Sequence, residues 1–78
     1  MESIEHLRNF IETETEGLRY YVSTKDVSSY GLLETTVFAE RDGIIDWDIL
    51  HEERHSTPEE AIEKHRYIIH HIGEFVTQ

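Results

Sequence analysis

The sequence has no cysteine, one proline and only four glycines among 78 residues. Without cysteine, neither a disulfide framework nor a thiolate metal site can supplement the small core of such a chain. The absence fits a reducing compartment, so we expect a cytoplasmic protein. No apolar run approaches the roughly 18 residues that a membrane span needs. The acidic first residues, MESIEHLRNF, lack the basic region of a signal peptide. The length predicts one small acidic domain over residues 1–78.

Basic residues are also scarce, with 7 Lys plus Arg against 17 Asp plus Glu and a formal net charge of −10. Nucleic-acid backbones and anionic membranes bind to clustered Lys and Arg, and this chain has no such cluster. We therefore expect no direct binding of nucleic acid or membrane. The excess of acid favours a protein partner with a basic patch.

The N-terminal segment has apolar residues at helical spacing. Ile4, Leu7 and Ile11 fall three to four residues apart, and the glycine at position 17 is a typical stop signal. The pattern predicts an amphipathic helix over residues 3–15.

The middle of the chain reads as strands. Aromatic and β-branched residues alternate with polar ones over residues 18–27, 32–41 and 44–54. Residues 42–43 are Asp-Gly, a strong signal for a hairpin turn. In the last strand the alternation predicts that Ile45, Trp47 and Ile49 form the dry face of the sheet, and that Asp46 and Asp48 face water.

The C-terminal segment carries the clearest helix signals. Thr57, Pro58 and Glu60 combine a capping hydroxyl, a proline at the first helical position and a capping-box glutamate. An apolar stripe follows, formed by Ala61, Ile62, Ile68, Ile69, Ile72 and Val76. The fold predicted is α+β, with α-β-β-β-α order and a three-stranded antiparallel sheet. Its C-terminal helix packs on one face, and the other face is either solvated or a dimer surface.

The string His51-Glu52-Glu53-Arg54-His55 matches H-E-x-x-H, the signature of zinc peptidases. That chemistry needs a helix, on which residues four apart share a face and converge on one ion. Here the string ends a strand, where residues four apart are separated by about 13 Å. We therefore interpret the match as coincidental and predict no zinc site.

The last helix contains three histidines. His65 falls within the apolar stripe, so it needs a hydrogen-bond partner, for which Glu34, Thr35 and Thr36 are the candidates on the sheet. The alternative is a functional His–Glu pair. His70 and His71 point away from the stripe and are expected to be solvated. Together with Glu74 they could form a weak metal site.

Three short motifs carry a resemblance to a group of small phage-encoded and bacterial proteins of unknown function. The motifs are the strand ETTVF at residues 34–38, the turn RHST at residues 54–57, and EEA at residues 59–61 followed by His65. In that group they read E-T-M-V-F, R-Y-S/T-T and E-E-A-x-x-x-H, so Thr36 and His55 depart from its pattern. The resemblance covers residues 34–65 and implies an accessory role without catalytic residues.

Three functions remain in competition on this sequence. The first is a non-catalytic protein-interaction module, such as a phage or prophage accessory protein acting on a host protein. The second is a DNA-mimic inhibitor of a nucleic-acid-binding protein, and the third is a small metal-binding or acid–base enzyme using histidines with Glu34 or Glu52. We expect no enzyme, cofactor or metal. The residues predicted to serve interaction or a polar core are Tyr21, Glu34, Trp47 and His65, and a homodimer is compatible with them.

Overall fold

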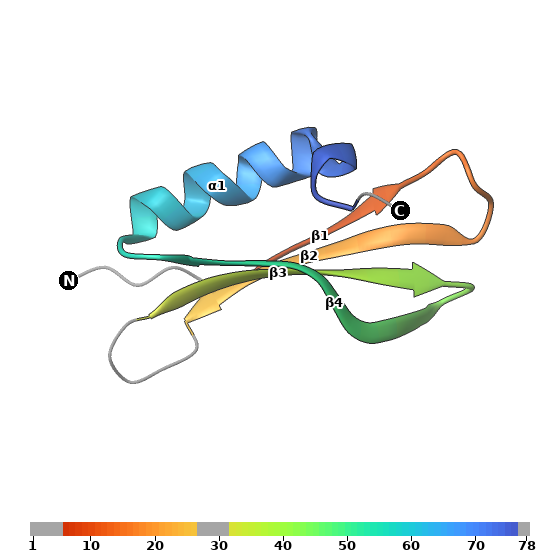
Figure 1. Cartoon of the computed structure of the whole chain (residues 1–78), viewed down its shortest axis with the longest axis horizontal. Helices are drawn as coiled ribbons and strands as arrows, with labels where there is room; N and C mark the ends of the chain where they lie inside the picture. Colours follow the sequence, from red (N-terminus) through yellow and green to blue (C-terminus); the bar gives the residue numbers. More distant parts are fainter. Residues whose placement is uncertain (1–5, 27–31, 77–78) are drawn as a thin grey trace.

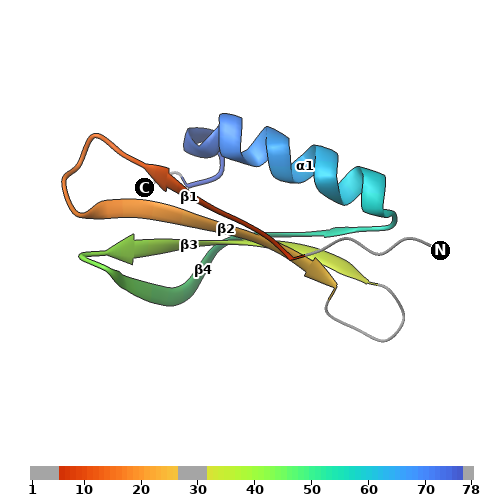
Figure 2. The same cartoon turned by 180° about the vertical axis from the view of Figure 1, so that it is seen from behind.

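A four-stranded antiparallel sheet carries one helix on one of its faces in the computed structural model, which describes residues 6–26 and 32–76 (Figures 1 and 2). The strands follow the chain in the order β1-β2-β3-β4. The elements are β1 (Leu7–Glu12), β2 (Leu18–Asp26), β3 (Leu33–Arg41), β4 (Ile44–His55), α1 (Pro58–His70) and the 3-10 helix η1 (Ile72–Glu74). The α+β class, the antiparallel pairing and the C-terminal helix on one face are confirmed, whereas the prediction of three strands is wrong. Among the described residues, no helix is both long enough and apolar enough to cross a membrane.

The fourth strand replaces the predicted N-terminal helix. Residues 7–12 pair with β2 in antiparallel register, from Leu7 opposite Thr24 to Glu12 opposite Arg19. The remainder of the predicted helix at residues 3–5, and the turn expected at 28–31, lie outside the described residues. In so short a segment the apolar residues fit a period of two as well as a helical period, and pairing with β2 decides between them.

The other local signals are confirmed. Asp42 and Gly43 both have positive φ, 51° and 84°, as a two-residue type I′ hairpin requires. The Thr57 hydroxyl accepts from the Glu60 amide at 3.1 Å and caps α1. The Glu60 carboxylate accepts in turn from the backbone of Ser56 at 3.1 Å, which completes a capping box shifted by one residue.

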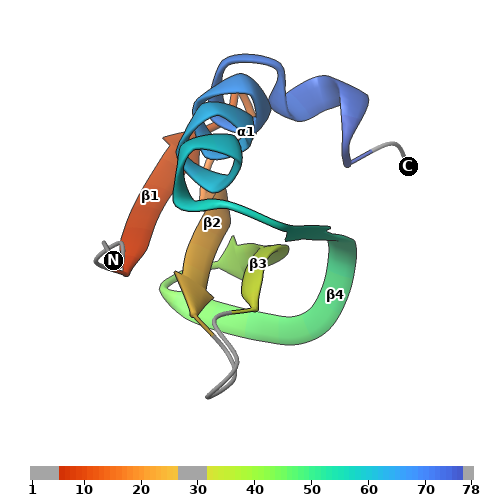
Figure 3. The ribbon, with the colours of Figure 1, turned by 90° about the vertical axis from the view of Figure 1, so that its left-hand side faces the viewer.

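The helix covers one face of the sheet and divides it into an apolar and a polar half. Viewed along the strands, α1 lies over that face alone (Figure 3). The apolar core unites the second half of α1 and the C-terminal segment with the centre of β2 and β3; its buried members are Tyr20, Val22, Val37, Ala39, Ile68 and Val76. The first half of α1 contacts the sheet through polar groups, described below.

The opposite face of the sheet carries no helix, and we call it the open face. Its central side chains are nevertheless buried, namely Ser23, Thr36, Phe38 and Glu40. The expectation that Ile45, Trp47 and Ile49 form the dry face is wrong, because they belong to this side: Ile45 pairs with Glu40, and the other two line a hollow with Phe38. Trp47 is 67% exposed and Ile49 is 51% exposed. A bulge opposite Phe38 interrupts the β3–β4 pairing there.

Candidate functional site

Four aromatic rings, one from each strand, form a continuous line across the open face, which we call the aromatic row. Phe10 stacks on Tyr21 with ring centroids 4.8 Å apart, and Tyr21 lies 6.3 Å from Phe38. Phe38 meets Trp47 edge to face at 5.1 Å. The row follows from register, because Phe10, Tyr21 and Phe38 are directly paired across three strands and therefore point to the same side. Its two ends are exposed, Phe10 by 43% and Trp47 by 67%.

An ion-pair cluster borders the row on the side of the hairpin turns. The Arg19 guanidinium donates to both oxygens of Glu40, at 2.7 and 2.9 Å, and lies 3.5 Å from Glu12. This bidentate contact holds the pKa of the Glu40 carboxyl below its usual range. The same guanidinium lies 4.3 Å from the centroid of the Phe10 ring, a cation–π contact.

A shallow hollow of about 400 Å³ borders the row on the other side. Its lining includes Tyr21, Phe38 and Trp47 from the row, with Ser23, Thr36, Ile49, His6, Lys25 and Glu34 around them. The His6 ring lies 2.6 Å from the Ser23 hydroxyl, and its pKa is lowered by burial and then by the charges of Arg8 and Lys25. Arg54 closes the rim by donating to Glu34 at 3.3 Å. The open face therefore has an aromatic centre and a polar, charged border.

The charges of the open face balance, although those of the chain do not. Strand pairing places four basic and four acidic side chains on this side: Arg8, Arg19, Lys25 and Arg54, with Glu12, Glu34, Glu40 and Glu52. The formal charge at these paired positions is zero. The whole excess of −10 thus comes from residues elsewhere in the chain.

A chain of buried hydrogen bonds crosses the other face of the sheet, beneath the first half of α1. It runs from Asn9 on β1 to His65 on α1 (2.7 Å), and from His65 to Thr24 on β2 (2.7 Å). Thr24 bonds Thr35 on β3 at 2.5 Å, and Thr35 bonds His55 on β4 at 2.8 Å. All four strands and the helix thus contribute one side chain each to this polar chain, and every buried polar side-chain atom in the described structure has a partner.

The direction of the polar chain is set by its end at Asn9. The Asn9 carbonyl oxygen can only accept, so the Nε2 of His65 donates to it and the Nδ1 of His65 is left to accept from Thr24. Thr24 then accepts from Thr35, and Thr35 accepts from the Nε2 of His55. His65 is neutral in this arrangement, because its Nδ1 accepts a hydrogen bond. Burial lowers the pKa of both histidines, and for His55 it outweighs the opposing effect of Glu53 and Glu60.

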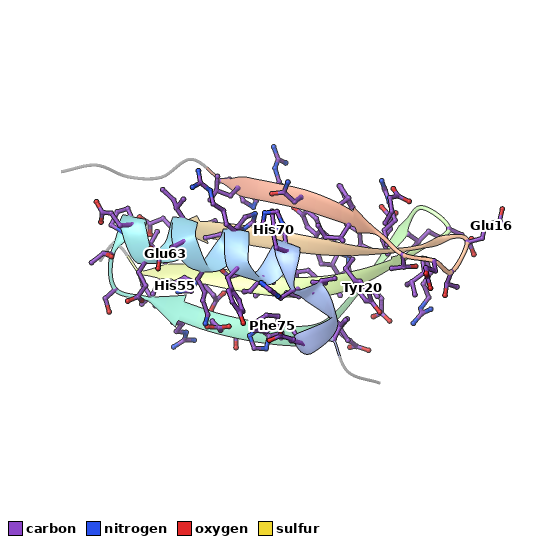
Figure 4. The ribbon with its side chains drawn as sticks, turned by 90° about the horizontal axis from the view of Figure 1, so that it is seen from above. Glu16, Tyr20, His55, Glu63, His70 and Phe75 are labelled. Atoms are coloured by element: carbon purple, nitrogen blue, oxygen red, sulfur yellow. The ribbon has the colours of Figure 1, made fainter. Side chains whose placement is uncertain are left out.

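The H-E-x-x-H string lies in β4, as predicted, and its two histidines have separate partners. His51 bonds Glu53 at 2.6 Å and packs edge-on against Phe75, with ring centroids 4.7 Å apart. His55 is the end of the polar chain, and its Nδ1 lies 3.8 Å from Glu60. Seen from the helix side, His55 lies beside the start of α1 and Phe75 lies further along the strand (Figure 4). Within residues 6–26 and 32–76, no group of three or more His, Asp or Glu side chains is arranged to hold a metal ion.

The histidines at the end of α1 are exposed, as predicted. His71 stacks on Tyr67 with ring centroids 4.3 Å apart and forms an ion pair with Glu74 at 3.3 Å. Tyr67 also donates to Glu74 at 3.3 Å. The His71–Glu74 contact therefore serves to fasten η1 to α1.

The four residues singled out from sequence divide between the two faces. Tyr21, Glu34 and Trp47 share the hollow on the open face. His65 is buried on the opposite side, where its partners are Thr24 and Asn9, so the candidate pairing with Glu34 is wrong. Of the other two candidates, Thr35 is one bond further along the polar chain, and Thr36 faces the open side.

Sequence reasoning missed both phenylalanines of the aromatic row. Phe10 was assigned to a helix, which hid its register with Tyr21. Phe38 lies between Val37 and Ala39, in a run of three consecutive apolar residues, so alternation gives no indication of its side. Leu7, Asn9 and Ile11 alternate with Arg8 and Phe10. This period of two is the signal that could have indicated a strand at Phe10.

Comparison of this chain with protein-family models, curated proteins and solved structures finds no match.

Proposed function

We propose that this protein is a non-catalytic protein-interaction module whose binding surface is the open face of the sheet. The observation that supports this most is the aromatic row, which spans all four strands and is exposed at both ends, at Phe10 and Trp47. An aromatic centre with arginine nearby and a polar rim is the anatomy of protein–protein interfaces.

A stacking platform for single-stranded nucleic acid also uses aromatic residues on a sheet, but it adds a positive groove that follows the backbone. Here the basic side chains of the face are matched by an equal number of acidic ones. Two of the four bases are already paired, Arg19 with Glu40 and Arg54 with Glu34. Binding of a nucleic-acid backbone is driven by counterion release when Lys and Arg neutralise phosphates, and few unpaired basic residues remain on this face. A protein is therefore the favoured partner.

The buried histidines support a structural role for the polar chain. A general base must reach a proton of the substrate. His65 and His55 are 3% and 4% exposed, and each ring already bonds a threonine. Glu34 and Glu52, the carboxylates considered for acid–base work, lie on the opposite face.

We propose that this module acts on a host protein, as a phage or prophage accessory protein would. The resemblance to phage-encoded accessory proteins and the acidic net charge support this role. Because the net charge of −10 lies outside the open face, a basic patch on such a protein would be attracted to the other surfaces of the domain.

The test compares two variants that remove an exposed apolar side chain from β4. Trp47→Ser changes the aromatic row, whereas Ile44→Ser changes a residue that is 73% exposed and lies on the helix side. Proteins captured from a bacterial lysate by the tagged wild-type chain are identified, purified and titrated calorimetrically against all three chains. We expect Trp47→Ser to weaken binding at least about thirtyfold and Ile44→Ser to leave it within about twofold. Equal affinity of the two variants for every captured protein would contradict the proposal.

A further inference from the structure

We propose that a groove at the end of α1 binds a small amphiphilic carboxylate. Tyr20 and Arg41 hold the carboxylate, and the apolar wall of the groove holds the body of the molecule. We call this site the end groove. It lies on the helix side of the sheet, opposite the open face, so it goes beyond the proposed function and does not depend on it.

The end groove lies where the sheet extends past the helix. The chain leaves α1 at His70 and turns into η1, whereas β2 and β3 continue toward the hairpin turns. Figure 4 shows Tyr20 past the end of α1, in the direction of Glu16 in the β1–β2 turn. The groove has a volume of about 610 Å³. That volume falls within the range of about 300–1,000 Å³ that is typical of ligand sites.

Three aliphatic side chains form the apolar wall of the end groove. They are Leu18 from β2, Ile72 from η1 and Val76 from the segment that follows η1. Val76 belongs to the buried core, and the other two are half-buried against it. The wall is therefore a continuation of the core beyond the end of the helix. An apolar body lying on it would remove this surface from water, which favours binding.

The Tyr20 hydroxyl has no partner within the described structure. Tyr20 is only 8% exposed, and its hydroxyl forms no hydrogen bond with a described residue. Every buried polar side-chain atom of the described residues does have a partner, so this hydroxyl lies at the accessible edge of Tyr20, in the groove that the residue lines. Buried tyrosines normally have a hydrogen-bond partner for this group. A bound acceptor would supply the missing one.

Arg41 supplies the positive charge beside this hydroxyl. Register pairs Arg41 with Leu18 and Ala39 with Tyr20. Arg41 and Tyr20 are therefore diagonal neighbours on one face, at a spacing of about 7–8 Å that long side chains can bridge. Arg41 forms no ion pair with a described residue, in contrast to Arg19, which is held by Glu40. An acceptor placed between the two side chains would receive hydrogen bonds from both.

The lining of the end groove has the charge of a carboxylate site. Among the described residues, no Asp or Glu lines it, although the chain has a net charge of −10. Glu74 and Asp42 follow lining residues in the chain, but the first contacts α1 and the second lies against the β1–β2 turn. One guanidinium and one hydroxyl match the single charge and the two oxygens of a carboxylate. A phosphate carries almost twice that charge and is a poorer match to one arginine.

The first measurement is a titration of the ¹⁵N-labelled full chain, followed by NMR of the backbone amides. The probe is 4-phenylbutyrate, up to about 10 mM at neutral pH and constant ionic strength. We expect saturable shifts confined to residues around the groove, with a dissociation constant below about 1 mM for a ligand of this size. The matched probe is 4-phenylbutanamide, which keeps the shape and lacks the charge. It should bind at least about tenfold more weakly, because a hydrogen bond to a charged acceptor is the stronger one.

The second measurement compares two arginine variants that change the net charge equally. Arg41→Gln should weaken binding of 4-phenylbutyrate at least about tenfold and leave binding of the amide within about threefold. Arg66→Gln removes a positive charge from the exposed side of α1 and should leave both probes within about twofold of the wild type. The acid-to-amide ratio thus separates contact with the carboxylate from a general effect of charge.

The third measurement removes the tyrosine hydroxyl. Tyr20→Phe should weaken binding of 4-phenylbutyrate about fivefold or more, whereas Tyr21→Phe, which changes the open face, should not. Because the Tyr20 hydroxyl bonds no described residue, Tyr20→Phe should not lower the urea midpoint of the chain. Weaker binding at unchanged stability therefore reports a contact with the ligand.

The outcomes that overturn the inference are distinct from those that concern the open face. Absence of saturable shifts with 4-phenylbutyrate, or shifts centred outside the groove, would overturn the site. Equal binding of the acid and the amide, or equal effects of Arg41→Gln and Arg66→Gln, would overturn the carboxylate. None of these results bears on Trp47, which lies on the opposite face of the sheet. Conversely, equal affinity of Trp47→Ser and Ile44→Ser for captured proteins would leave the end groove in place.

Discussion

Replacing Thr35 with valine is the sharpest test of the polar chain, because it removes one hydroxyl and keeps the branched shape. Thr35 is fully buried, and its hydroxyl both donates to Thr24 and accepts from His55. After the substitution the Nε2–H of His55 has no acceptor, and Thr24 loses the hydrogen bond that it accepts. The polar chain is cut at its centre.

The magnitude follows from the two groups that lose a partner. A buried polar group left unsatisfied costs about 1–3 kcal/mol, and two such groups give about 2–4 kcal/mol if the site relaxes in part. A domain of this length has a total stability of about 4–12 kcal/mol. The Thr35→Val variant should therefore lose a large share of its stability while remaining folded without denaturant.

The assay is urea unfolding at neutral pH, followed by far-UV circular dichroism. The matched control is Thr36→Val, which makes the same change at the next residue of β3. The Thr36 side chain is 9% exposed on the open side and makes no hydrogen bond with another described side chain, so the free energy of unfolding of Thr36→Val should change by less than about 1 kcal/mol. If both variants unfold at the same urea concentration with the same slope, the polar chain does not stabilise the fold and the reasoning fails.

Two further predictions concern stability. Burial lowers the folded-state pKa of His55 and His65 below the ordinary 6.5. The unfolded chain therefore binds more protons between those lowered values and 6.5. Stability should be complete above about pH 6.5 and should fall below it by up to about 1.4 kcal/mol per pH unit for each histidine. Urea midpoints at about pH 7.5, 6.5 and 5.5 test this, and equal midpoints would contradict it. Gly17 has φ +81°, and a Cβ there would collide with Asp42, whereas Gly73 has open space around it. Gly17→Ala should cost about 1–3 kcal/mol and Gly73→Ala less than about 0.5 kcal/mol in the same assay, and similar losses would refute the argument.

The parts of the fold that the sequence predicts correctly are those with local physical causes. The Asp42-Gly43 pair favours positive φ, and the Thr57 hydroxyl caps a helix without help from distant residues. The N-terminal strand has no such local cause. Its apolar residues fit two periods, and the strand forms because β2 offers an edge with which it can pair.

The candidate site could be predicted only in part, for a related reason. Alternation correctly indicates that Ile45 and Trp47 share a face, but it does not say which face the helix covers. That choice depends on β3, where both Val37 and Phe38 are apolar although they point to opposite sides. The helix packs on the side of Val37 because Ala39 leaves room for Ile68 there, and all three are buried together.

The two faces of this sheet distribute polarity in an unusual way for so small a domain. Half of the face beneath the helix consists of threonine, histidine and asparagine side chains. Their hydrogen bonds fix how the strands and the helix are aligned, but they bury little apolar area. The open face holds the four rings of the aromatic row and leaves its two ends, Phe10 and Trp47, exposed. Small domains are marginal because they bury little apolar surface, so leaving this surface uncovered has a cost in stability. A partner that covers it adds stability that grows with the logarithm of its free concentration relative to the dissociation constant, so binding on the open face and folding of the domain are thermodynamically linked.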